Sequence, residues 1–171
     1  MTKPTVGRKI THRSLPATPK GKSLVLYFYP KDLTSGCTAE GLDFKSHSAG
    51  FSRAGAVIRG VSRDPAASHA KFRAKHGFPF ELVADEDSAL CDAFDVIQQK
   101  SLYGRKYMGI ERSTFLIGAD GRLFREWRKV KVAGHAAEVL EAVRELRAKP
   151  KTKVESGKAK VKSVVRRRSR A

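Results

Sequence analysis

The chain has few of the features that mark secreted or membrane proteins. Its 171 residues include two cysteines, Cys37 and Cys91, and their wide separation excludes a CxxC motif, a paired-ligand zinc site and a disulfide framework. No stretch approaches the roughly 20 apolar residues of a membrane span, and no apolar core follows the basic N-terminus as in a signal peptide. We therefore expect a soluble, cytoplasmic protein with reduced thiols.

Acidic residues are also scarce, since 35 lysines and arginines stand against 17 aspartates and glutamates and leave a net charge of +18. The excess lies at the two ends. Residues 1–22 carry six cations and no acid, and residues 149–171 carry ten cations and one acid, so residues 23–148 hold a net charge of only +3. The composition predicts one globular domain over 23–148, between a basic N-terminal arm and a basic C-terminal tail, both flexible.

The tail, residues 149–171, lacks aromatic and large apolar side chains, so we predict that it is disordered. One interpretation is that the tail binds nucleic acid or another polyanion electrostatically. The other, which we prefer, is a solubilising extension with only weak, nonspecific affinity for polyanions.

Between the two ends, the pattern of apolar residues alternates between buried strands and amphipathic helices. Strands are predicted at 24–30, 56–62 and 80–85 and on both sides of the 119–122 turn, and helices from Thr38, over 64–77, over 87–96 and over 134–149. The order β-α-β-α-β-α-β-β-α predicts an α/β fold in which helices flank a central sheet.

Cys37 occupies a position that suits a reactive thiol. Pro30 ends the first predicted strand, residues 31–36 form a loop, and Cys37 falls in or just before the first turn of the next helix. Free backbone N–H groups and the positive end of the helix dipole would stabilise a thiolate there. A buried structural cysteine would satisfy the same position, so placement alone leaves both interpretations open.

The spacing of Pro30, Thr34 and Cys37 in "YFYPKDLTSGCTAEGLDF" resembles the active-site signature of the peroxiredoxins, and in particular the bacterioferritin-comigratory, or Q-type, branch. The similarity continues through "GVSRDP", "FPFELVADEDSALCDAFDV" and "MGIERSTFLIGADG", and covers roughly residues 21–147. It implies a thioredoxin-like fold with a mixed sheet and reduction of a peroxide by a cysteine, without haem, metal or flavin.

The resemblance implies a role for each residue of the motif. Cys37 would attack the peroxide as a thiolate and become a sulfenic acid. Thr34 would place its hydroxyl beside the sulfur, and Pro30 would shield the pocket from water. Arg112, in "GIERSTF", matches the arginine that keeps the thiolate charged and bonds the peroxide. Thr34 could otherwise be a capping residue and Arg112 a surface cation.

Five histidines raise the question of a metal site or a general base. His47, His69 and His76 fall in predicted helices, His135 at a helix start, and His12 in the N-terminal arm. We interpret all five as solvated or capping groups.

The cysteine that would resolve the sulfenic acid is not evident. Many Q-type members carry it five residues after the peroxidatic cysteine, where this chain has Leu42, and the following helix contains none. Cys91 is the one intrachain candidate, but its apolar helical context also suits a buried structural thiol. We prefer one-cysteine behaviour with Cys91 structural.

The sequence thus predicts a thiol peroxidase that reduces hydrogen peroxide and organic hydroperoxides, with thioredoxin, glutaredoxin or a small thiol as reductant. We expect a monomer. Two alternatives remain: a thiol–disulfide oxidoreductase, disfavoured by the missing CxxC, and a nucleic-acid-associated protein that uses its basic ends on an inactive thioredoxin-like scaffold.

Overall fold

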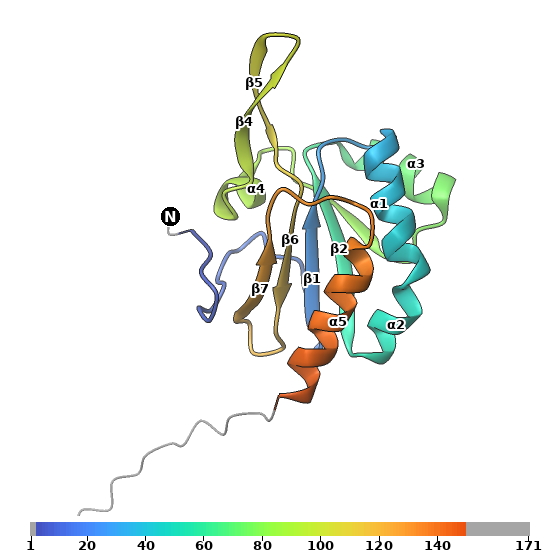
Figure 1. The fold of residues 1–171 in the computed structure, drawn as a ribbon, viewed down its shortest axis with the longest axis vertical. Helices are drawn as coiled ribbons and strands as arrows, with labels where there is room; N and C mark the ends of the chain where they lie inside the picture. The colour runs from blue at the N-terminus through green and yellow to red at the C-terminus, as the bar shows by residue number, and fades with distance from the viewer. Residues whose placement is uncertain (1–2, 150–171) are drawn as a thin grey trace, which may run out of the picture.

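The computed structural model describes residues 3–149, and a five-stranded sheet in the order β3-β2-β1-β6-β7 forms its centre (Figure 1). These strands are β1 (Ser23–Phe28), β2 (Ala56–Ser62), β3 (Glu81–Ala84), β6 (Ser113–Ile117) and β7 (Leu123–Trp127). β1, β2 and β3 run parallel, whereas β6 is antiparallel to both β1 and β7. The predicted mixed sheet is confirmed.

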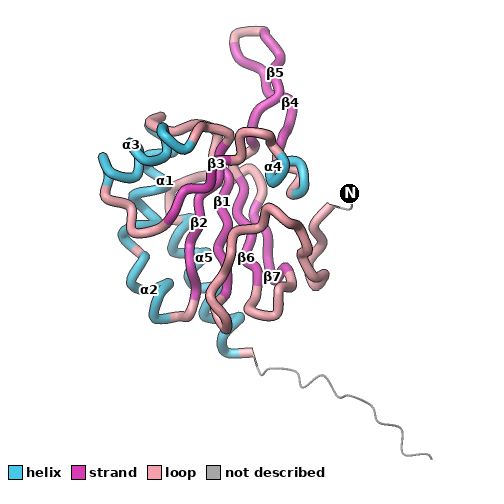
Figure 2. Tube along the Cα trace, turned by 180° about the vertical axis from the view of Figure 1, so that it is seen from behind, coloured by secondary structure: helices cyan, strands magenta, loops and turns pink. Residues whose placement is uncertain are grey.

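Alternate side chains of β1 enter two separate apolar cores, one on each face of the sheet. Val25 and Tyr27 join the first core, and Leu24, Leu26 and Phe28 join the second. Helices α1 (Ser35–Ser46), α2 (Ser48–Arg53) and α5 (His135–Ala148) cover the first core, and α3 (Ala66–His76) packs beside β3. Figure 2 shows α4 (Ala89–Ala93) and the N-terminal segment on the opposite side.

The helix predictions agree with the structure except at the ends of the helices. The helix predicted from Thr38 begins at Ser35. Pro65 precedes α3 as its N-cap instead of lying in the first turn, and Gly77 ends the helix in the left-handed conformation with φ of 61°. Because glycine lacks a Cβ, it adopts that conformation without steric cost. The prediction of a helix over 87–96 was too long, since α4 has only five residues.

A β-hairpin that the sequence patterns did not reveal projects from one end of the molecule (Figure 1). It consists of β4 (Ile97–Leu102) and β5 (Arg105–Ile110), paired antiparallel around Tyr103 and Gly104. Most of β5 is exposed, so its side chains show no alternation between a buried and a solvated face. That alternation is the signal on which strand prediction depends.

The N-terminal arm lies against the turn between β6 and β7. The backbone N–H of Gly7 donates to the Leu123 carbonyl, and that of Ile10 donates to the Gly121 carbonyl, each over 2.8 Å. Ile10 also packs against the second core, together with Leu15. The predicted basic tail lies outside the described residues from position 150 onward.

The interpretation of all histidines as solvated or capping groups was wrong for two of them. His69 and His135 are 3% and 4% exposed. His69 contacts Asp32, and the His135 ring lies 2.8 Å through Nε2 from the hydroxyl of Thr114. Helical spacing cannot reveal such contacts, because their partners come from other parts of the chain.

Within residues 3–149, no helix has the length and apolar character needed to cross a bilayer.

Candidate active site

Cys37 lies in the first turn of α1, as the sequence predicts. Thr34 is the N-cap in extended conformation, and its carbonyl accepts the backbone N–H of Thr38 over 2.9 Å. Cys37 is only 2% exposed and belongs to the first core. Its sulfur therefore lies near unpaired backbone N–H groups of the helix start, in a largely dry setting that strengthens electrostatic contacts.

Arg112, which directly precedes β6, contacts the sulfur of Cys37. Its Nη2 donates to Cys37 Sγ over 3.3 Å. The register explains this contact: Ser113 pairs with Phe28, the last residue of β1, so the preceding Arg112 lies where the chain leaves β1 for the Cys37 loop. The structure thus brings together Cys37 and Arg112, two residues that sequence analysis placed in one site.

Glu40 completes a three-residue arrangement that sequence analysis missed. It stands three positions after Cys37 on α1, is 1% exposed, and accepts a hydrogen bond from Arg112 Nη1. The guanidinium therefore bridges a carboxylate and a sulfur through two nitrogens, which fixes its orientation. The i,i+3 spacing of Glu40 from Cys37 was the available signal, since such residues share a helix face.

Burial dominates the electrostatics of this arrangement. It raises the pKa of Glu40 to about 7, although Arg112 favours the ionised carboxylate. Burial by itself would lower the pKa of Arg112, but the charges of Glu40 and Cys37 outweigh it and raise that pKa. The guanidinium therefore stays protonated, and Glu40 titrates near neutral pH.

Lys100 brings a further cation near the site from the missed hairpin. Burial lowers its pKa, Arg112 lowers it further, and Cys37 acts in the opposite direction. These influences place Lys100 within electrostatic range of both residues. β4, where the sequence predicted no strand, therefore carries a cation that interacts electrostatically with the site.

Thr34 and Pro30 lie on the exposed side of the same loop. The Thr34 hydroxyl donates over 2.9 Å to the carbonyl of Lys31, so its oxygen lone pairs remain free to accept. Pro30 is the second residue after β1, directly following Tyr29. Both residues are thus near the helix start that carries Cys37.

Cys91 does not belong to the site formed by Cys37, Arg112 and Glu40. It belongs to the second core, on the opposite face of the sheet from Cys37, and is 0% exposed. Asp85 accepts the backbone N–H groups of Leu90 and Cys91 and so caps the start of α4. Asp87 also accepts the backbone N–H of Ala89 at the start of α4. Burial and the charge of Asp85 raise the pKa of the Cys91 thiol.

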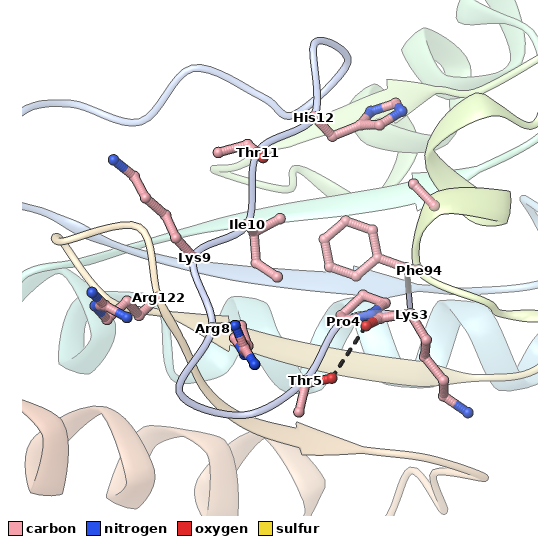
Figure 3. Close-up of a pocket in the computed structure, with 11 residues that line it drawn as sticks. Lys3, Pro4, Thr5, Arg8, Lys9, Ile10, Thr11, His12, Phe94 and Arg122 are labelled. Atoms are coloured by element: carbon pink, nitrogen blue, oxygen red, sulfur yellow. Dashed lines mark hydrogen bonds between the residues drawn. The ribbon is translucent and has the colours of Figure 1, made fainter. Parts of the chain in front are cut away.

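A separate hollow of about 710 Å³ lies between the N-terminal arm and α4 (Figure 3). Ile10 and Phe94 point toward each other within it, while the charged ends of Lys3 and Lys9 point away from them. Lys3 is paired with Asp95 over 3.0 Å. None of the residues that line this hollow contributes to the Cys37 site.

Among residues 3–149, no three histidine, cysteine or carboxylate side chains gather as a candidate metal site.

Comparison with known proteins identifies the family. Residues 2–125 match the AhpC/TSA family. Peroxiredoxin Bcp of Xanthomonas campestris pv. campestris is 59% identical over 124 residues, 72% of this chain and 78% of the relative. Peroxiredoxin Bcp of Bacillus subtilis is 52% identical over 130 residues, 76% of this chain and 83% of the relative.

A solved structure gives the same result for the fold. The bacterioferritin comigratory protein of Xanthomonas campestris, described for its alkyl peroxide reduction activity, superposes with a TM-score of 0.71 at 56% identity. The match covers 75% of this chain and 82% of that chain. The chain therefore belongs to the peroxiredoxin family, and it is a thiol-dependent peroxidase with a thioredoxin-like fold, similar to the Bcp, or Q-type, members.

Proposed function

We propose that Cys37 is the peroxidatic cysteine of this peroxidase and that Arg112 activates it. The observation that supports this most directly is the contact of 3.3 Å between Arg112 Nη2 and Cys37 Sγ at the start of α1. A fixed guanidinium stabilises the thiolate before the reaction and the negative charge that builds on the peroxide during it.

The proposed reaction has two stages. The Cys37 thiolate attacks one oxygen of the peroxide, the O–O bond breaks, and the other oxygen leaves with the electron pair and takes a proton to form water or an alcohol. Cys37 is thereby oxidised to a sulfenic acid. A thiol then attacks that sulfur and releases water, and a second thiol reduces the resulting mixed disulfide and restores Cys37.

Thr34 and Pro30 have supporting roles in this proposal. When a peroxide enters, the Thr34 hydroxyl turns from the Lys31 carbonyl and donates to the peroxide, or accepts its proton while keeping its present bond. Pro30 lacks an N–H group and shields the loop from water.

We further propose that the enzyme resolves its sulfenic acid with an external thiol. Cys91 is buried in the second core, and burial together with Asp85 keeps it in the poorly nucleophilic thiol form. The electron donor would be thioredoxin, glutaredoxin or a small thiol, and the enzyme would act as a monomer. Alkyl hydroperoxides are proposed as substrates beside hydrogen peroxide, by analogy with the Xanthomonas campestris protein.

The test compares the two cysteines of the chain. Cys37→Ser should abolish thiol-dependent peroxide consumption, because serine cannot form the sulfenic acid, whereas Cys91→Ser should retain it. If Cys37→Ser keeps even about a tenth of wild-type turnover, a loss far smaller than removal of a nucleophile causes, the assignment is wrong.

A further inference from the structure

A buried polar cluster beside the active-site loop has no part in the reaction described above. Its centre is Asp32, whose Oδ1 accepts the Tyr29 hydroxyl over 2.6 Å. Its Oδ2 lies 2.7 Å from His69 Nδ1 and accepts the Ser68 hydroxyl over 2.8 Å. The side chains of Asp32 and His69 are 2% and 4% exposed, so the pair is shielded from water.

The partners of His69 indicate which protons it carries. Nδ1 faces the Asp32 carboxylate, and Nε2 lies 3.1 Å from the backbone carbonyl of Val83, which can only accept. Both ring nitrogens therefore serve as donors, as in an imidazolium. The neighbouring Asp64 favours the same charge. The Tyr29 hydroxyl lies 3.4 Å from Nδ1 but donates to Asp32 over the much shorter distance of 2.6 Å, and the Ser68 hydroxyl also donates to Asp32.

The directions of the pKa shifts agree with this geometry. Burial works against both charges, but the mutual hydrogen bond and charge attraction prevail, so the pKa of His69 is raised and that of Asp32 is lowered. The cluster therefore holds a buried ion pair between α3 and the loop that follows β1.

The backbone of Asp32 is anchored as well as its side chain. Its N–H donates over 2.8 Å to Asp64 Oδ2, so both its main chain and its side chain are held. The next residue, Leu33, is 51% exposed and has φ of 60°, a conformation that is costly for a residue with a branched side chain. Thr34 follows directly, so the anchoring of Asp32 maintains the backbone turn that sets the position of Thr34.

We propose that Asp32 and His69 are positioning residues for peroxide reduction, whose ion pair holds the 30–34 loop so that Thr34 faces a peroxide at Cys37. The inference rests on the proposed roles of Cys37 and Thr34. Arg112 contacts the sulfur and is itself held by Glu40, and neither residue belongs to this loop. Loss of the ion pair should therefore impair the reaction with peroxide more than the reactivity of Cys37 in general.

Two electrophiles separate these effects. The rate constant for oxidation of Cys37 by hydrogen peroxide is measured by quenching and mass spectrometry, and the rate constant for its alkylation by iodoacetamide is measured in parallel. In His69→Asn and Asp32→Asn, the peroxide rate constant should fall about tenfold to a hundredfold, as expected for a misplaced catalytic group. The iodoacetamide rate constant should change far less.

Ser68→Ala is the matched control, because it removes one hydrogen bond to the same Asp32 oxygen and leaves both charges in place. It should keep most of the peroxide rate constant. Equal losses toward both electrophiles in folded His69→Asn, an unchanged peroxide rate constant, or an equally selective loss in Ser68→Ala would overturn the proposal. A wild-type protein that peroxide does not oxidise at Cys37 would instead refute the proposed function.

A measurement on the unmodified chain tests the ion pair even if the variants do not fold. In protein with nitrogen-15-labelled histidine, the ring nitrogens of His69 should both show the chemical shifts of protonated nitrogen at pH 7. A neutral His69 ring at that pH would overturn the proposal.

Discussion

Arg112 Nη2 contacts Cys37 Sγ over 3.3 Å although 75 residues separate the two in the chain. The antiparallel pairing of β6 with β1 creates this contact, since it sets Arg112 beside the end of β1. Glu40 holds the other nitrogen of the same guanidinium. The orientation of Arg112 therefore depends on both the sheet and the helix.

Arg112→Lys should lower the second-order rate constant for peroxide by about a hundredfold to a thousandfold, the range found when one donor is lost from a charged transition state. A lysine keeps the charge but presents one compact ammonium, which cannot contact Glu40 and Cys37 in the same geometry. Stopped-flow measurement of peroxide reduction gives the rate constant. Arg144→Lys, at an exposed site on α5, is the control and should leave it unchanged. A rate constant that survives Arg112→Lys would remove Arg112 from the proposed mechanism.

Thr34→Val should cost at most about 2 to 4 kcal/mol of transition-state stabilisation, because it deletes one hydroxyl near developing charge. Thr34→Ser keeps the hydroxyl and should restore most of the peroxide rate constant. Comparing the rate constants of the two variants separates hydrogen bonding from loop structure. If Thr34→Val reacts with peroxide as fast as the wild type, Thr34 has no role in the chemistry.

Cys91→Ser should retain peroxide turnover with an external thiol, and its Cys37 sulfenic acid should persist about as long as that of the wild type. Cys91 lies on the opposite face of the sheet, and reaching Cys37 would require α4 to leave the second core. Intact mass spectrometry after one equivalent of peroxide follows the sulfenic acid. An intrachain disulfide in the wild type, together with lost turnover in folded Cys91→Ser, would show that Cys91 is the resolving cysteine.

Glu40 should make the stability of the protein depend on pH. Burial raises its pKa from the ordinary 4.5 to about 7, so the folded state binds this proton more tightly than the unfolded state. The stabilisation that protonated Glu40 contributes to the folded state is fully present below pH 4.5 and is lost as the pH rises to about 7.

Glu40→Gln lacks this titration and serves as the reference protein. The free energy of unfolding of the wild type, relative to that of Glu40→Gln, should fall by up to roughly 3 kcal/mol over this pH interval. Urea denaturation at a series of pH values measures the difference. A difference that rises with pH would show that Arg112 keeps Glu40 ionised despite its burial.

Local patterns were sufficient for much of the fold. The apolar run after Ser23 and the pattern at 56–62 correspond to β1 and β2, and the Asp120-Gly121 turn joins β6 to β7. These elements have one or two buried faces, so their apolar residues recur with the period of the backbone. The β4–β5 hairpin lacks a buried face over most of its length and was therefore missed.

The candidate site was partly predictable for a similar reason. Thr34 and Cys37 are neighbours in one loop and helix start, so their spacing alone places them together. Arg112 was identified by resemblance to the family, whereas Glu40 and the Asp32–His69 pair were not identified at all. A buried charge is tolerated only where specific partners surround it, and those partners come from distant segments.

The sequence by itself determined most of the strand and helix pattern, the helix-start position of Cys37 and the placement of most of the net positive charge outside residues 23–148, because each depends on residues close together in the chain. Only the tertiary structure decided that Arg112 contacts Cys37, that Glu40 orients Arg112, and that the two cysteines lie on opposite faces of the sheet. Strand pairing and burial make these choices, since they bring distant residues together and exclude the water that would otherwise screen their charges.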